Sequence, residues 1–182
     1  MNSLKNHFLI SVPHLNDPFF EKSVVYLCEH DKKGAMGLVI NKAIKKNNIT
    51  LKDSSSDIEF NKYLKENYLH IGGPVLLDKV LFLHTNNEIS KSVPVSDEVS
   101  ISGNIELLSS IQKSKDIKSK IFLGHAGWGS GQLEREIENG DWLIQKSSTN
   151  LIFEQKIDNI WIMATNSLGI EIGDISNTPG YS

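Results

Sequence analysis

One stretch, residues 121–137, decides how this chain folds: Ile121-Phe122-Leu123-Gly124-His125-Ala126-Gly127-Trp128-Gly129-Ser130-Gly131-Gln132-Leu133-Glu134-Arg135-Glu136-Ile137. It begins with an apolar run that is typical of a buried strand. Four glycines around one tryptophan follow, and they predict a loop, because glycine tolerates backbone angles that other residues avoid. The acidic residues after the glycines favour the first turn of a short helix. We therefore expect a strand, a glycine-rich loop and a helix arranged around Trp128.

The composition predicts one globular domain over residues 1–182. The chain has 182 residues, of which 39% are hydrophobic, which is enough to bury about two thirds of the unfolded surface. Its apolar runs stay far below the ~18 residues of a membrane span, and residues 1–6 lack a signal-peptide pattern. Cys28 is the only cysteine, which excludes an intrachain disulfide and a cysteine-based zinc site. We expect a cytoplasmic protein.

The charge distribution argues against specific nucleic-acid binding. The formal net charge is -3 at pH 7, and Arg135 is the only arginine, although arginine is the residue best suited to read guanine or phosphate. The lysines at positions 42, 45 and 46 belong to a polar stretch, 42–57, that we interpret as a flexible solvated loop. Residues 113–120 are interpreted as a second solvated, basic loop, and residues 173–182 as a loose tail.

The alternation of apolar and polar residues along the chain predicts an α+β domain. Helices are expected over residues 56–67, from Asn104, after Gly131, and from a cap at Asp158 to Leu168. The hairpin of residues 23–30 and 35–41 is the clearest local pattern. Because strands and helices are mixed irregularly, a regular βαβ winding is disfavoured. Nine strands are expected, over residues 7–12, 23–30, 35–41, 69–71, 80–84, 99–102, 142–145 and 150–153 and at the start of 121–137.

Five segments of the chain carry a family likeness: Phe8-Leu9-Ile10-Ser11-Val12-Pro13 with Asp17-Pro18-Phe19-Phe20, Ser23-Val24-Val25-Tyr26-Leu27-Cys28-Glu29-His30, Gly34-Ala35-Met36-Gly37-Leu38-Val39-Ile40-Asn41, Gly72-Gly73-Pro74-Val75, and Gly124 to Glu134. In these segments, and in order from Phe8 to about Gly180, the chain resembles the YqgE/AlgH family of small bacterial proteins. It departs from the family at Ser130, where a proline is usual, and at His125, where a tyrosine is frequent.

The resemblance implies a single compact α+β domain. Its large sheet, mainly antiparallel or mixed and partly barrel-like, is flanked by about four short helices. The resemblance supplies no settled activity, catalytic residue or cofactor. One branch of the family carries a name tied to regulation of alginate production, which associates the family with a pathway without indicating a mechanism.

The glycine-rich loop allows three interpretations. Gly127, Gly129 and Gly131 between a strand and a helix could form a phosphate cradle. The spacing does not match the dinucleotide fingerprint, a Walker lysine is missing, and Glu134 and its acidic neighbours would repel a phosphate. The glycines could instead serve only to turn the chain around a core-filling Trp128, which we favour. A small-ligand or partner site is the remaining alternative.

Cys28 and His30 stand two apart on a strand, so they are expected on one face, where a Cys–His nucleophile is possible. The run around Cys28 looks fully buried, and a packed core cysteine is the favoured interpretation. His30, His84 and His125 fall near strand ends and could converge on a metal. Because none of the usual histidine spacings is present, we expect no metal site.

We expect a non-enzymatic binding or regulatory protein that acts through an unknown protein or small-molecule partner. Loops on a rigid scaffold commonly carry function, and Gly72-Gly73-Pro74 is a second candidate loop, although a structural role is favoured for it. An enzyme based on Cys28 or His125, and an indirect transcriptional regulator, are the alternatives. The candidate binding residues are Gly72, Gly73, Pro74, His125, Gly127, Trp128, Gly129, Gly131, Gln132 and Glu134. No cofactor is expected.

Overall fold

The computed structural model describes residues 2–44, 68–85, 89, 91–104, 106, 114 and 116–170. The described strands form one sheet in the order β10-β1-β2-β3-β9-β6-β8-β7, with β4 and β5 attached beside β9. Their bounds are β1 (His7–Ser11), β2 (Val24–Asp31), β3 (Gly34–Val39), β4 (Ala43–Ile44), β5 (Leu69–Ile71), β6 (Val75–His84), β7 (Val93–Pro94), β8 (Ser100–Ser102), β9 (Ser119–Gly129) and β10 (Trp142–Lys146). The described helices are α3 (Gln132–Glu138), α4 (Thr149–Phe153) and α5 (Ile157–Ser167).

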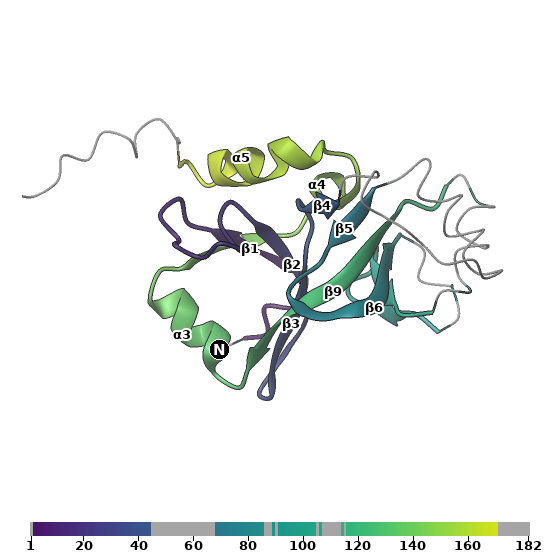
Figure 1. Cartoon of the computed structure of the whole chain (residues 1–182), viewed down its shortest axis with the longest axis horizontal. Coiled ribbons are helices and arrows are strands. Elements are labelled where there is room, and N and C mark those ends of the chain that lie inside the picture. Colours follow the sequence, from purple (N-terminus) through teal and green to yellow (C-terminus); the bar gives the residue numbers. More distant parts are fainter. Residues whose placement is uncertain are drawn as a thin grey trace, which may run out of the picture.

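Strand β9 runs through the middle of the sheet and changes partners along its length (Figure 1). One edge pairs antiparallel with β6. The other edge pairs with β5 in parallel over Ile121–Leu123 and then with β3 in antiparallel over Ala126–Gly129. The partner change falls at Gly124, whose φ is 64°, and the β6 ladder shifts its register nearby. The sheet is curled into a half-barrel, which confirms the predicted α+β class and the large, mainly antiparallel sheet.

The glycine-rich loop predicted after Leu123 is wrong, because residues 124–129 continue β9 as a strand. The backbone of this segment finds partners on β3, where Trp128 lies opposite Ala35 and Gly129 opposite Gly34. Strand propensity depends strongly on such pairing. The hydrogen bonds to β3 therefore outweigh the low intrinsic tendency of glycine to form strands. The turn is confined to Ser130 and Gly131, and Gly131, with a φ of 68°, precedes α3.

The second half of the chain requires three further corrections. Residues 150–153, predicted as a strand, lie in α4, because the Ser148 side chain accepts a hydrogen bond from the Leu151 N–H and caps a helix. Asp158 is not a cap: it lies in the first turn of α5, and Lys156 occupies the cap position. Leu168, expected to face inward, is 38% exposed.

Other predicted elements have mixed outcomes. The β2–β3 hairpin is confirmed, with Asp31 opposite Gly34 at its end. Gly169 has the positive φ, 76°, expected after the last helix. The helix expected over 56–67, most of the helix from Asn104 and of the loop 42–57, and the tail 173–182 lie outside the described residues.

The helices cover the two faces of the β1–β2 region (Figure 1). On one face, α4 and α5 pack through Ile152, Ile160 and Trp161 against alternate residues of β1 and β2. On the other, α3 packs through Leu133 against the intervening residues, together with Trp128 and Trp142. None of the helices in the described part of the chain is long and apolar enough to cross a membrane.

Candidate functional site

The segment Gly72–Pro74 packs directly on the glycine-bearing part of β9. A Cβ atom at Gly73 would lie 2.0 Å from the carbonyl carbon of His125, and one at Gly72 would lie 2.4 Å from the Gly124 oxygen. The backbone N–H of Gly72 donates to the Leu123 carbonyl at 2.8 Å. The two glycine motifs are therefore neighbours in space, and Gly72 and Gly73 are required by the close approach of two backbones.

Four of the ten predicted site residues line one depression of about 390 Å³, which we call the aromatic pit. These four are Pro74, Gly127, Trp128 and Gln132. The structure thus brings together the Pro74 segment, the end of β9 and the start of α3. The pit is completed by Leu15, Asn16, Asp17, Phe20, Glu136, Asp141 and Trp142.

The walls of the pit are aromatic rings held by a carboxylate. Phe20 is stacked on Trp128 at a centroid distance of 6.3 Å, and Trp142 meets Trp128 edge to face at 6.1 Å. Oε2 of Glu136 accepts hydrogen bonds from both indole N–H groups, at 2.8 Å from Trp128 and 2.9 Å from Trp142. Its Oε1 accepts from the amide of Gln132 at 2.9 Å. These bonds fix the rings in place.

The charged residues that line the pit are all acidic. Asp17, Glu136 and Asp141 contribute carboxylates, and none of the lining residues in the described part of the chain is a lysine, arginine or histidine. Oδ1 of Asp17 accepts the backbone N–H groups of Phe19 and Phe20, each at 2.8 Å, which holds Phe20 at the rim. Aromatic faces next to carboxylates favour a positively charged group.

An exposed apolar strip adjoins the pit. Val75, Leu76 and Leu77 at the start of β6 are all exposed, Leu76 to 55%. A Cβ at Gly127 would lie 3.9 Å from Val75, so the strip borders the pit. Leu76 has a φ of 51°, a conformation that is uncommon for a bulky residue and that concentrates at functional positions.

The other predicted site residues are not among those that line the pit. Oε1 of Glu134 is 3.0 Å from Nε2 of His30, and a hydrogen bond from its own backbone, followed by the one from His30, lowers the pKa of Glu134. His125, on β9, lies opposite Val75 of β6, and partial burial lowers the pKa of His125. Gly129 accommodates the Gln132 side chain, whose Oε1 accepts the Gly129 N–H at 3.0 Å. Gly131 forms the turn before α3.

The geometry does not form a Cys–His pair. A bulge between Leu27 and Glu29 reverses the alternation of β2, so Cys28 faces the α5 side while His30 reaches Glu134 of α3. The prediction that they share a face is therefore wrong. The Cys28 thiol is 1% exposed, its hydrogen bond goes to the Tyr26 carbonyl, and burial raises its pKa. A buried thiol of raised pKa is a poor nucleophile.

The three histidines considered as metal ligands are separated. His84 lies opposite Ser119 and His125 opposite Val75, at the two ends of β6, and His30 is engaged by Glu134. Among the described residues no group of three or more histidine, cysteine, aspartate or glutamate side chains could hold a metal ion.

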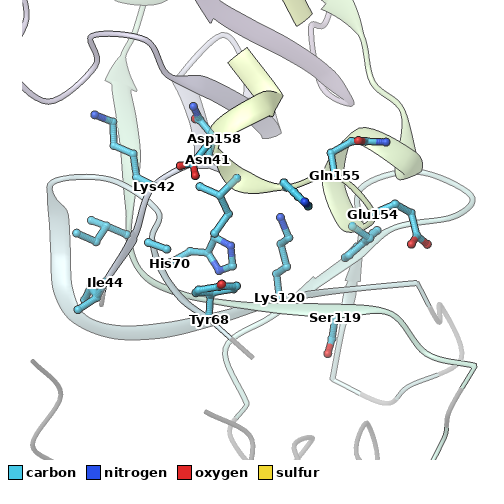
Figure 2. A pocket seen from close by; sticks show the side chains of 15 residues that line it. Asn41, Lys42, Ile44, Tyr68, His70, Ser119, Lys120, Glu154, Gln155 and Asp158 are labelled. Carbon is cyan, nitrogen blue, oxygen red and sulfur yellow. The ribbon is translucent and has the colours of Figure 1, made fainter. Parts of the chain in front are cut away.

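A larger cavity of about 800 Å³, which we call the lysine pocket, was missed by the sequence interpretation. It lies between β4, β5, the start of β9 and the turn that joins α4 to α5, and Figure 2 shows it from close by. Among the described residues, none lines both this cavity and the aromatic pit. The lining consists of Asn41, Lys42, Ala43, Ile44, Tyr68, His70, Ile71, Ser119, Lys120, Phe153, Glu154, Gln155, Lys156, Ile157 and Asp158.

Lys120 and His70 form the floor of the lysine pocket (Figure 2). Residue 120 was predicted in a solvated loop, which is wrong, because it lies in β9. Burial lowers the pKa of Lys120 to about 8. Burial, together with the charge of Lys120, lowers the pKa of His70 to about 3, although backbone groups of Ile121 and Tyr68 oppose this.

One sequence signal could have identified this floor. Lys120 stands two positions before Phe122 and therefore on the same covered face of the strand. His70 lies between Leu69 and Ile71 in a short apolar strand. Polar residues at such covered positions are uncommon and informative.

The chain is similar in sequence to a family of bacterial proteins. Residues 8–173 match the sequence profile described as AlgH-like. A UPF0301 protein of Marinomonas sp. (strain MWYL1) is 40% identical over 182 residues, covering 99% of this chain and 97% of that protein. A UPF0301 protein of Shewanella denitrificans is 40% identical over 185 residues, with 100% of both chains covered.

Two solved structures have a similar fold. The solution structure of the AlgH protein from Pseudomonas aeruginosa superimposes with a TM-score of 0.74 at 29% identity, covering 100% of this chain and 97% of that one. A crystal structure of a protein from Corynebacterium diphtheriae gives a TM-score of 0.72 at 19% identity, covering 92% of this chain and 87% of that one. The second likeness concerns the fold alone.

Proposed function

The chain belongs to the AlgH-like family, and we propose that it is a binding protein, not an enzyme, which recognises a partner protein at the aromatic pit. One observation carries the proposal. Pro74, from one motif, and Gly127, Trp128 and Gln132, from another, line the same depression. We place this activity in the cytoplasm, and a regulatory role follows if the partner is itself a regulator.

The chemistry of the pit indicates the group that it receives. Carboxylates of Asp17, Glu136 and Asp141 stand beside the rings of Phe20, Trp128 and Trp142, and a lysine or arginine side chain fits both surfaces. The exposed strip Val75–Leu77 borders the pit, and contiguous exposed apolar residues mark interaction surfaces. The expected partner segment therefore carries a basic residue next to apolar ones.

The fold has no need of glycine at position 127. Gly127 is exposed, its φ is not in the left-handed region, and a Cβ there would meet nothing closer than 3.9 Å. Glycine weakens a strand interior, and in strands it often marks a place where a ligand or another backbone approaches closely. A partner backbone that packs against Gly127 explains why this position is a glycine, which the fold itself does not require.

Defined peptides test the proposal. The probes are short synthetic peptides with one arginine flanked by leucines, and the same peptides with uncharged citrulline. Tryptophan fluorescence is read in a Trp161→Phe background, since Trp161 packs on the α5 side, away from the pit, and Trp128 and Trp142 then report alone. We expect the arginine peptide to bind about tenfold more tightly than the citrulline peptide, because a desolvated charge-assisted contact contributes on the order of 1.5 kcal/mol.

Variants locate the binding site. Gln132→Ala and Leu76→Ser should weaken arginine-peptide binding, whereas Val93→Ser, at an exposed apolar residue of β7, should leave it unchanged. If Gln132→Ala keeps both stability and peptide affinity, or if citrulline peptides bind equally well, the pit is not a binding site and its motif serves folding.

Direct recognition of DNA is disfavoured by the net charge of -3 and the single arginine. Phosphate neutralisation would make such binding fall steeply with salt. A mobility-shift assay over a range of salt concentrations should therefore show no specific complex.

A further inference from the structure

Lys120 places a positive charge in the lysine pocket, and none of the described residues forms an ion pair with it. Its ammonium group makes one hydrogen bond among the described residues, a long contact of 3.5 Å to the Ile40 carbonyl. Burial lowers the pKa of Lys120. Lys120 is partly buried, and because a poorly solvated charge without a partner is costly, such a site favours binding of an anion.

The acidic residues at the pocket do not neutralise Lys120. Glu154 is engaged by Lys118 in an ion pair at the rim. Asp158 lies toward the opposite wall, near Asn41, in Figure 2. Lys156 also lines the cavity, so a second cation is available to an incoming anion.

His70 offers a second, complementary group. His70 is buried, with 2% exposure, and its Nε2 has no hydrogen-bond partner among the described residues. Nδ1 lies 3.3 Å from the Ile121 carbonyl. Because a carbonyl only accepts, Nδ1 must carry the proton, which leaves a lone pair on Nε2 of the neutral ring. Nε2 can therefore accept a hydrogen bond from a ligand but cannot donate one.

We propose that the lysine pocket binds a small organic oxyanion that carries a neighbouring hydroxyl group. The carboxylate or phosphate of the ligand lies against the ammonium of Lys120, and the hydroxyl donates to Nε2 of His70. The cavity of about 800 Å³ is within the range of small-molecule sites. Hydroxy-carboxylates and sugar phosphates share this chemistry. The site is separate from the aromatic pit, so either proposal can fail without the other.

Matched pairs of probes test both contacts by calorimetric titration. Glycolate is compared with acetate, and 2-hydroxyethyl phosphate with ethyl phosphate, so that each pair differs in one hydroxyl group and the two pairs distinguish carboxylate from phosphate. The hydroxylated member should bind more tightly in the intact protein. In ¹⁵N spectra of the His70 ring, its binding should shift the Nε2 resonance upfield, as donation to a lone pair requires.

Three variants separate charge from packing, each checked for folding by its thermal unfolding. Lys120→Met should weaken anion binding by about tenfold or more. His70→Phe, which keeps an aromatic ring beside Phe122, should abolish the preference for the hydroxylated probe while binding of the unhydroxylated probe persists. Lys79→Met, at an exposed lysine of β6, should change neither. The proposal is overturned if no probe binds at millimolar concentration, if Lys120→Met binds as the parent does, or if His70→Phe keeps the hydroxyl preference.

Discussion

Trp128 and Glu136 are joined by a hydrogen bond of 2.8 Å from the indole Nε1 to Oε2. The same oxygen accepts the indole of Trp142 at 2.9 Å. The sequence predicts that the acidic residues of α3 stabilise the helix dipole and repel phosphate. The structure gives Glu136 a different role, because its carboxylate satisfies two buried indole N–H groups and so attaches α3 to the ends of β9 and β10.

Removing this carboxylate should destabilise the fold. We expect Glu136→Ala to lower the free energy of unfolding by about 2–4 kcal/mol, because two indole donors lose their partner and an unsatisfied buried donor costs ~1–3 kcal/mol. Glu136→Gln, whose amide oxygen can still accept, should cost less. Urea denaturation followed by circular dichroism measures both. Glu138→Ala, on an exposed position of α3, is the control and should stay within about 0.5 kcal/mol of the parent. Equal losses for Glu136→Ala and Glu138→Ala would contradict this role.

The glycines of the two motifs should differ sharply in how well they tolerate substitution by alanine. Gly73→Ala would place a methyl group 2.1 Å from the Ala126 nitrogen, and because backbone cannot move aside as a side chain can, we expect a loss of about 3 kcal/mol or more, or failure to fold. Gly127→Ala should fold with nearly parental stability, since space is available. Thermal unfolding compares the two. A well-folded Gly73→Ala protein would show that the packing of Gly73 on β9 is looser than described.

Local patterns explain which parts of the fold were predictable. The β2–β3 hairpin is encoded by neighbouring residues, an apolar alternation and a turn at Asp31–Gly34, and it was predicted correctly. The strand character of residues 124–129 depends on β3, some ninety positions earlier in the chain, and no local signal reveals this pairing. The same limit applies to the β2 bulge, which moved Cys28 and His30 to opposite faces.

The candidate sites were predictable to different degrees. Pro74, Gly127, Trp128 and Gln132 were selected for unusual residue types, and their convergence on one depression required the packing of β6 on β9. Glu136, which holds that depression together, looked like any acidic helix residue. Lys120 was assigned to solvent with its lysine-rich neighbours, because the beginning of β9 cannot be located from charge alone.

Cys28 should be unreactive in the folded protein. Its thiol is 1% exposed and burial raises its pKa, so the thiolate needed for attack is not formed near neutral pH. We expect a disulfide reagent such as dithiobisnitrobenzoate to label the native protein slowly, at the rate of unfolding, and to label it at once in denaturant. Rapid labelling under native conditions would restore the thiol-based enzyme as an alternative.

The buried charge of Lys120 should make stability depend on alkaline pH. In the folded protein its pKa is about 8, whereas an ordinary lysine, as in the unfolded chain, has a pKa of 10.5. Between these values the unfolded chain binds more protons than the folded one, so this residue makes the free energy of unfolding rise with pH across that window. Below pH 8 the folded state bears the full cost of the buried ammonium, on the order of 3 kcal/mol.

Lys120→Met isolates this effect, because other lysines and tyrosines titrate in the same range and cancel in the difference between variant and parent. We expect the variant to be more stable than the parent at pH 7 by up to about 3 kcal/mol, and the advantage should shrink through pH 8–10.5 as Lys120 of the parent loses its proton. Denaturation across this pH range measures the difference, with Lys79→Met as the exposed control. A difference that stays constant with pH would mean that the substitution acts through packing and that Lys120 is already solvated, which would also remove the basis for an anion site at its ammonium group.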